Sequence, residues 1–334
     1  MGKIAVLGCG TWGSALAQGL AENGHIVHAW HHRADVLAEM AYSRKHPRLD
    51  QFTFHKNINF EPDIIQITND ADKIICATPS HAVRGIMMEL KGNISQQAII
   101  VNVAKGIENG TLDTMSEVIS KETGHNANYI VSVYGPSHAE EVISGHPTTL
   151  VAASIFHESA KKVQAIFSSN ILRVYTNHDI LGVELGGSLK NVIAIAAGIC
   201  DGIGFGDNTK SALMTRGLTE ITRLGEAMGA EKNTFFGLSG IGDLIATCYS
   251  QHSRNRFVGE EIGRGKSLST IYNEMDMVAE GVKTTQSVHD LAKIHKVEMP
   301  ISEGVYQLLF NDKDPKKVVS SLMTRDLRHE QISD

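Results

Sequence analysis

A run of four apolar residues near the amino terminus leads straight into a glycine motif, and this pairing constrains the fold more than any other feature. Residues 4–7 (IAVL) predict a buried strand, and Gly8, Gly10 and Gly13 follow in the pattern G-x-G-x-x-G. The first glycine of such a motif permits a tight turn, the second lets the backbone approach a pyrophosphate, and the third lets the next helix pack against the strand. Because the chain has 31 glycines, the motif needs support from its context.

The residues after the motif supply that context. An Ala- and Leu-rich helix is expected over residues 14–22, Asn23 and Gly24 end it, and residues 26–30 (IVHAW) return as a second strand. The three elements complete one βαβ unit, in which the positive end of the helix is directed at the glycine turn. The sequence therefore predicts a dinucleotide site, against the alternative of a glycine-rich turn that binds no ligand.

The next part of the chain alternates strands with helices. Val- and Ile-rich strands are expected at residues 74–77, 98–102, 129–133 and 148–152, with helices around residues 82–90, 112–121 and 139–144. Such an alternation is typical of an α/β domain with a doubly wound, Rossmann-like parallel sheet. From about Val183 onward only helical segments follow, which predicts a second, all-α domain. We place the domains at residues 1–181 and 182–334, with the boundary near residues 179–182.

Composition excludes several classes of protein. A net charge of -6 argues against a nucleic-acid partner, which would require a basic face. The four cysteines lie far apart, no H-E-x-x-H spacing occurs, and His31 and His32 are expected to point apart on a strand, so we expect no metal. The longest apolar run, residues 192–200, is about half the length of a membrane span. Since the first residues form a strand instead of a signal peptide, we expect a cytoplasmic protein without a membrane span.

The ends of the strands are where an open α/β sheet binds its ligand. Thr11 and Trp12 in the glycine turn are expected along the path of the pyrophosphate and nicotinamide. After the second strand the sequence has His32 and Arg33, where an NAD-specific protein usually has an acidic residue. A cation there would attract a 2′-phosphate, so we expect NADPH, with NADH as a possible second cofactor. The alternative is an exposed Arg33 with Asp35 as a helix cap.

Two further strand ends carry polar groups. Lys105 directly follows a buried strand, at the edge where it can reach both cofactor and substrate. Residues 135–139 (GPSHA) form a turn that opens a helix, and its backbone N–H groups favour anionic ligands.

The helical domain begins with a lysine in an apolar setting. Lys190 follows Gly186 and Gly187 by one helical turn, so we expect a ligand to approach that face without meeting side chains. Desolvation by its apolar neighbours lowers the pKa of a lysine and suits it to proton transfer, against the alternative of a lysine that snorkels to the surface. Further on, Asp243 lies among glycines, and residues 253–256 (SRNR) offer two guanidiniums beside an amide, as phosphate-binding groups do. Each of these could also be structural.

Together these residues resemble the bacterial-type NAD(P)-dependent glycerol-3-phosphate dehydrogenases, from Lys3 to about Leu309. The motifs that carry the resemblance are G-x-G-x-x-G from Gly8, Lys105-Gly106, Gly135-Pro136, ELGGxxKN from Glu184, DGIGFG from Asp201, Gly242-Asp243-Leu244, Ser253-Arg254-Asn255 and Glu280-Gly281. Their order and spacing make the match specific.

The resemblance implies reversible hydride transfer between NAD(P)H and dihydroxyacetone phosphate, which gives sn-glycerol 3-phosphate for phospholipid synthesis. It implies Lys190 as the catalytic acid and base. The implied substrate contacts are Lys105, Gly135, Ser137, Asp243, Ser253, Arg254 and Asn255. The implied cofactor contacts are Gly8, Gly10, Thr11, Trp12, Gly13, His32, Arg33, Lys105, Ala139, Arg254, Val278 and Glu280.

Two positions depart from the family's pattern. Tyr134 stands where a small residue is more usual, and His138 where an aromatic residue is expected. Two other functions stay open on the sequence: another two-domain NADP-dependent hydroxyacid or ketopantoate-type reductase, and a non-catalytic NADP-binding sensor. The Ser253-Arg254-Asn255 cluster favours a phosphorylated ketone or alcohol as the small-molecule partner. An apolar surface on the helical domain would favour a homodimer.

Overall fold

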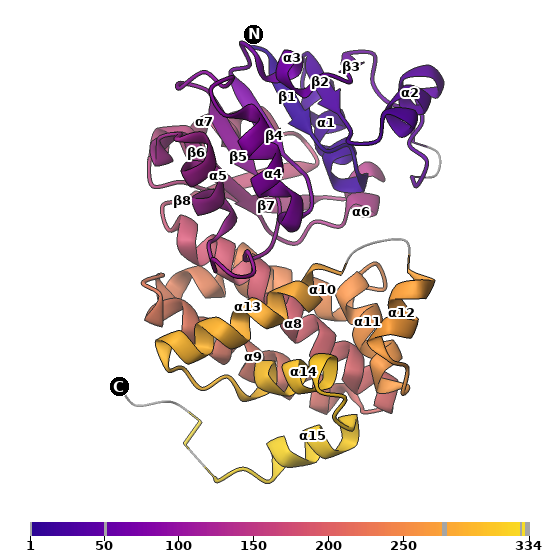
Figure 1. Cartoon of the computed structure of the whole chain (residues 1–334), viewed down its shortest axis with the longest axis vertical. Helices are drawn as coiled ribbons and strands as arrows, with labels where there is room; N and C mark the ends of the chain where they lie inside the picture. The colour runs from indigo at the N-terminus through magenta and orange to yellow at the C-terminus, as the bar shows by residue number, and fades with distance from the viewer. Residues whose placement is uncertain (1, 50–51, 276–278, 328, 331–334) are drawn as a thin grey trace.

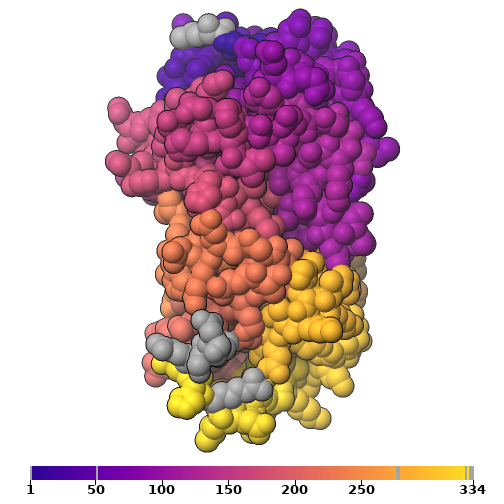
Figure 2. Space-filling model, turned by 90° about the vertical axis from the view of Figure 1, so that its left-hand side faces the viewer, coloured from indigo at the N-terminus to yellow at the C-terminus, as the bar shows by residue number. Residues whose placement is uncertain are grey.

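The computed structural model describes all residues except 1, 50–51, 276–278, 328 and 331–334. A sheet domain that contains the amino terminus lies at one end of the molecule, and a helical domain lies at the other (Figure 1). The space-filling view shows the same two parts stacked along the long axis (Figure 2).

The sheet domain is built on one sheet, in which the described residues form eight strands in the order β3-β2-β1-β4-β5-β6-β7-β8. The strands are β1 (Ile4–Leu7), β2 (Val27–Trp30), β3 (Ile58–Phe60), β4 (Lys73–Cys76), β5 (Ile99–Asn102), β6 (Ile130–Tyr134), β7 (Thr148–Ala153) and β8 (Leu172–Asn177). Chain order reverses between β1 and β4, which pair in parallel from Ile4 opposite Lys73 to Leu7 opposite Cys76. A ligand site is therefore expected beyond the carboxyl ends of these two strands.

Helices cover both faces of this sheet, as its apolar strands require. The helices of the sheet domain are α1 (Thr11–Glu22), α2 (Ala34–Ser43), α3 (Ile64–Thr68), α4 (Ser80–Leu90), α5 (Met115–Thr123), α6 (Ala139–Ile143) and α7 (His157–Phe167), with a short turn η1 (Ala127–Tyr129). The doubly wound fold is thus confirmed.

The sheet differs from the expected one in one respect. It is mostly parallel, but β7 runs antiparallel to β6, with Val133 opposite Ala152. The prediction of a parallel sheet was wrong for this pair, because the apolar pattern of β7 does not report direction. The sequence also left β3 and β8 unassigned: β3 has three residues, and β8 alternates buried and exposed positions at the sheet's edge.

The second domain consists of helices in the described residues. They are α8 (Ile180–Ile203), α9 (Asp207–Ala227), α10 (Asp243–Tyr249), α11 (Arg254–Gly263), α12 (Leu268–Glu274), α13 (Glu280–His295), α14 (Pro300–Phe310) and α15 (Pro315–Met323), with short turns η2 (Lys232–Phe236) and η3 (Leu238–Gly242). Asp179 caps α8, since its carboxylate accepts a hydrogen bond from the Gly182 N–H at 2.8 Å.

The helix α8 is the axis of this domain. It is long and apolar enough to cross a membrane, but 89% of its most apolar window is buried inside the protein, so we interpret it as a core helix. Glycines bring α11 against it: a Cβ at Gly198 would lie 1.9 Å from the Arg256 carbonyl, and one at Gly259 would lie 2.0 Å from the Ile195 carbonyl. This backbone contact places the start of α11 beside the helix that carries Lys190.

Candidate active site

The glycine turn has the geometry that a dinucleotide site needs. Gly8 has φ +100°, a left-handed conformation that favours glycine, and a Cβ at Gly13 would lie 1.9 Å from the Gly8 carbonyl. Packing explains those two glycines. A Cβ at Gly10 would meet no described protein atom within 4 Å, so packing does not explain that one. The turn leads into α1 at Thr11, and the residues therefore fit a pyrophosphate at this helix N-terminus.

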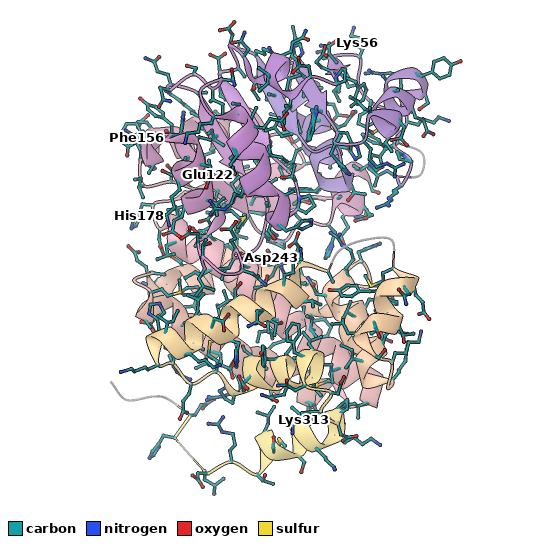
Figure 3. All side chains as sticks on the ribbon, viewed as in Figure 1. Lys56, Glu122, Phe156, His178, Asp243 and Lys313 are labelled. Atoms are coloured by element: carbon teal, nitrogen blue, oxygen red, sulfur yellow. The ribbon has the colours of Figure 1, made fainter. Side chains whose placement is uncertain are left out.

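Two lysines from different domains meet on one carboxylate at the domain junction, where Figure 3 labels Asp243. Lys190 Nζ on α8 lies 2.5 Å from Asp243 Oδ1, and Lys105 Nζ, just after β5, lies 2.6 Å from Asp243 Oδ2. Asp243 is 1% exposed and Lys190 is 5% exposed. With both amines protonated the cluster carries one net positive charge, which favours an anionic substrate.

Burial and charge set the protonation of this cluster. Desolvation is the main cause that lowers the pKa of Lys190 to about 8; Asp243 opposes this shift and Lys105 adds to it. For Asp243, burial raises the pKa, but the two ammonium groups outweigh it, so the pKa lies below its usual value. Lys190 can therefore exist as ammonium or amine near neutral pH, which is the property of a general acid and base.

The turn after β6 completes this side of the site. Gly135 has φ +143°, and its carbonyl accepts hydrogen bonds from Lys105 Nζ at 3.1 Å and from the Ser137 hydroxyl at 3.0 Å. An open cavity of about 450 Å³ lies between this turn and the end of α10, and its lining includes Ser137, His138 and His252. Burial, and then the charges of Lys190 and Lys105, lower the pKa of His138, which lines this cavity.

The three residues at the start of α11 differ in what they can do. Ser253 caps the helix by accepting from the Arg256 N–H at 3.2 Å, and the Asn255 carboxamide oxygen accepts from the Gly281 N–H at 2.9 Å. Both are buried. The Arg254 pKa is lowered by desolvation, while the carboxylate of Glu280 opposes the shift. In this triplet Arg254 is exposed, so its guanidinium can reach a charged ligand, and its two neighbours hold the helix start in place.

The expected 2′-phosphate site lies in the loop after β2. His32 and Arg33 are exposed, and Arg33 forms an ion pair of 2.6 Å with Asp35, which is also exposed. The expectation that His31 and His32 point apart was wrong: β2 ends at Trp30, so both lie in the loop, with ring centroids 4.6 Å apart.

Ala139 and Glu280 are two further cofactor candidates, and only Glu280 bridges the two domains. Ala139 packs with Trp12 in a small apolar cluster between α6 and α1. Glu280, the first residue of α13, accepts hydrogen bonds from the N–H of Ser80 at 3.1 Å and from its hydroxyl at 2.5 Å, which joins the domains. Val278 lies outside the described residues.

The sequence analysis did not identify Thr247 as a hydrogen-bond partner of Lys190, and it misinterpreted Gly186 and Gly187. Thr247 accepts a hydrogen bond from Lys190 Nζ at 2.5 Å, and its position four residues after Asp243 on one helix was an available signal. The expectation that Gly186 and Gly187 admit a ligand was wrong. A Cβ at Gly186 would lie 2.8 Å from the Ser239 carbonyl, and one at Gly187 would lie 2.5 Å from the Tyr134 ring, so protein already occupies both places.

A buried polar network beneath the cluster was also missed. The Glu184 carboxylate accepts hydrogen bonds from Asn102 at 3.0 Å, from the Ser132 hydroxyl at 2.8 Å, and from the Ser116 N–H and hydroxyl at 3.0 and 2.6 Å. Among the described residues, no group of three or more His, Cys, Asp or Glu side chains is arranged to hold a metal ion.

Comparisons with known proteins agree with this geometry. The family described as NAD-dependent glycerol-3-phosphate dehydrogenase matches with its N-terminus at residues 3–160 and its C-terminus at residues 179–320. A curated glycerol-3-phosphate dehydrogenase (NAD(P)+) of Prosthecochloris aestuarii is 50% identical over 98% of this chain and 99% of its own. The crystal structure of glycerol-3-phosphate dehydrogenase from Coxiella burnetii superposes with TM-score 0.92 at 36% identity, and covers 96% of this chain and 98% of its own.

The rival reductase is similar in fold alone. A ketopantoate reductase from Ralstonia eutropha gives a TM-score of 0.60 at 14% identity. Fold and site define a two-domain dehydrogenase, with a dinucleotide turn in one domain and a lysine–carboxylate cluster at the junction with the other. The chain belongs to the family of NAD-dependent glycerol-3-phosphate dehydrogenases. The expected enzyme class, an NAD(P)-dependent oxidoreductase, is thereby confirmed.

Proposed function

We propose that the chain catalyses reversible hydride transfer between NAD(P)H and dihydroxyacetone phosphate, to form sn-glycerol 3-phosphate for phospholipid synthesis, with Lys190 as the general acid and base. The buried ammonium of Lys190 lies 2.5 Å from Asp243, and this observation carries the assignment of Lys190. The chain belongs to the dehydrogenase family and has an intact glycine turn, so the cofactor site is present as well. The bound nicotinamide supplies or accepts the hydride.

The side chains of the cluster divide the remaining work. An ammonium has three N–H donors. Asp243 and Thr247 engage two of those of Lys190, which leaves the third for the substrate oxygen that becomes an alkoxide. Lys190 donates its proton there during reduction and takes it back during oxidation. Asp243 orients Lys190 and Lys105 together, one on each oxygen.

Arg254 is proposed to bind the substrate phosphate, assisted by backbone N–H groups and by Asn255. Arg254 is exposed at the start of α11, and an arginine–phosphate contact is charge-assisted and therefore strong. Its energy positions the carbonyl at the reacting centre, so it contributes to turnover as well as to binding.

A double-mutant cycle tests the substrate and the phosphate site together. NADPH oxidation is measured with dihydroxyacetone phosphate and with dihydroxyacetone, for the wild-type enzyme and for Arg254→Ala. We expect a large loss of kcat/KM for the variant on the phosphorylated ketone and little further loss on the other, with a coupling above about 2 kcal/mol. Additive losses would place the phosphate elsewhere and reopen the hydroxyacid-reductase function.

We propose NADPH as the preferred cofactor, with Arg33 and His32 at its 2′-phosphate. The Arg33–Asp35 pair is exposed, and solvent weakens exposed ion pairs, so a phosphate can displace Asp35 at small cost. Arg33→Asp should raise the KM for NADPH far more than that for NADH, since the variant loses a charged contact to the 2′-phosphate. Equal changes in the two KM values would exclude Arg33 as the residue that binds the 2′-phosphate. The control is Arg173→Asp, a charge reversal on the distant edge strand β8.

Residues 1–181 are proposed to bind the cofactor and residues 182–334 to supply the acid and the phosphate site.

We further propose a cytoplasmic homodimer. The four cysteines are free and buried, as in a reducing compartment, and the helical domain exposes large apolar side chains such as Phe257 and Tyr272. Light scattering on the purified chain would give twice the monomer mass for a dimer and the monomer mass if this proposal fails.

A further inference from the structure

Tyr134 ends β6 at the junction of the domains, and its hydroxyl ties two strands together. The side chain is fully buried. Its hydroxyl donates to the Ala104 carbonyl at 2.5 Å and accepts from the Asn102 carboxamide at 3.1 Å. Because Ala104 directly precedes Lys105, this bond fixes the backbone from which the Lys105 side chain projects.

The ring of Tyr134 lies between the Lys105 ammonium and α8, the helix that carries Lys190. Lys105 Nζ lies 5.7 Å from the ring centroid, within the range of a cation–π interaction. The ring edge packs on α8, where a Cβ at Gly187 would lie 2.5 Å from Tyr134 Cδ2. Since Gly187 is one turn before Lys190, the ring sets how closely α8 approaches the sheet at that level.

We propose that Tyr134 is a positioning residue that holds Lys105 against Asp243 and fixes the distance between the sheet and the part of α8 that carries Lys190. A purely structural role would need only an apolar side chain of similar size. Instead the described geometry combines a satisfied buried hydroxyl with a ring that meets an ammonium. The proposal rests on the proposed function, in which Lys190 transfers the proton.

The proposal has a consequence for the pH dependence of the reaction. The groups that face Lys190 are Asp243 and Cys248 on α10, Lys105 after β5, and His138 in the turn after β6. Lys105 lowers the pKa of Lys190, whereas Asp243 raises it. When Lys105 is no longer held in place, one depressing charge is lost and the pKa of Lys190 rises. Reduction requires the ammonium, so its alkaline limit moves to higher pH.

The test compares Tyr134→Phe and Tyr134→Leu with a buried aromatic outside the site, Phe167→Leu on α7. For Tyr134→Leu we expect kcat to fall about tenfold and the alkaline limit of kcat/KM to rise by about half a pH unit, while the KM for NADPH stays unchanged. Tyr134→Phe keeps the ring and should lie between this variant and the wild type. Phe167→Leu should lower only the thermal stability.

A second pair of variants separates this proposal from the proposed function. Lys105→Met should move the alkaline limit in the same direction, and adding Tyr134→Leu to it should move the limit no further. A Tyr134→Leu enzyme with a wild-type pH profile, or a further shift in the double variant, would overturn the positioning role. An unchanged profile in Lys105→Met would instead contradict the proposed cluster itself. If Tyr134→Leu does not fold, Gly187→Ala, which displaces the ring, takes its place and must show the same shift.

Discussion

Two buried carboxylates lie at the junction of the domains, and they carry opposite electrostatics. Asp243 binds two ammonium groups, and its pKa is lowered although burial alone would raise it. Glu184 accepts hydrogen bonds from hydroxyl, amide and N–H groups, and burial raises its pKa. Asn102 links the Glu184 network to the hydroxyl of Tyr134, and Lys105 links the Asp243 cluster to the ring of the same residue.

The difference shows that burial alone does not define a reactive site. Glu184 accepts hydrogen bonds from neutral donors on β5, β6 and α5, which is how a carboxylate joins elements of a fold. Asp243 is held by charges that a proton transfer would change. Substitutions of Lys190, Asp243 and Glu184 test this comparison.

Lys190→Met should have the largest effect. It keeps the length of the stem and removes the proton donor, so kcat should fall by roughly a hundredfold or more while NADPH binding is retained. Steady-state kinetics and a cofactor titration measure the two quantities. The matched control is Lys210→Met, a second buried lysine that pairs with Asp201 at 2.5 Å and should leave kcat nearly unchanged. Near-normal turnover in Lys190→Met would shift the role of the acid to Lys105.

Asp243→Asn should have the next largest effect, and it acts through pKa. Removing the carboxylate takes away the group that raises the pKa of Lys190 and leaves Lys105, which lowers it. The alkaline limit of ketone reduction should therefore move below about pH 8, opposite in direction to the shift expected for Tyr134→Leu. Uncompensated charge should also lower stability by about 3–5 kcal/mol. The pH profile of kcat/KM and denaturant unfolding measure both; a limit at or above the wild-type value would contradict the role of Asp243.

The sequence predicted the parts of this site that local rules determine. The glycine turn, the lysine after β5 and the lysine on the first long helix of the second domain follow from short patterns with a defined chemistry. Long-range contacts were beyond it. Nothing local shows that the Tyr134 ring fills the space left by Gly187, or that Glu184 gathers donors from β5, β6 and α5.

The same limit explains the errors in the sheet. An apolar run predicts a buried strand equally well in either direction, so the antiparallel β7 could not be distinguished from a parallel strand. The three residues of β3 are too few for a periodic signal. The directions of strands and the partners of glycines are decided by the whole fold.

Glu184→Gln should have the smallest effect, and it completes the comparison. Gln keeps one oxygen for Asn102, Ser132 and the Ser116 N–H, and its NH₂ can donate to the Ser116 hydroxyl. We therefore expect kcat to change less than about twofold and the alkaline limit of kcat/KM to stay at the wild-type pH. Loss of the Glu184 carboxylate should instead change how the free energy of unfolding depends on pH. Since the folded pKa of Glu184 is raised, the folded wild type binds more protons, and its stability falls as pH rises from the unfolded pKa to the folded one. The variant lacks this loss, so its unfolding free energy should decline less over that range. A kinetic defect as large as that of Asp243→Asn would show that both carboxylates serve the reaction, and would end the distinction between them.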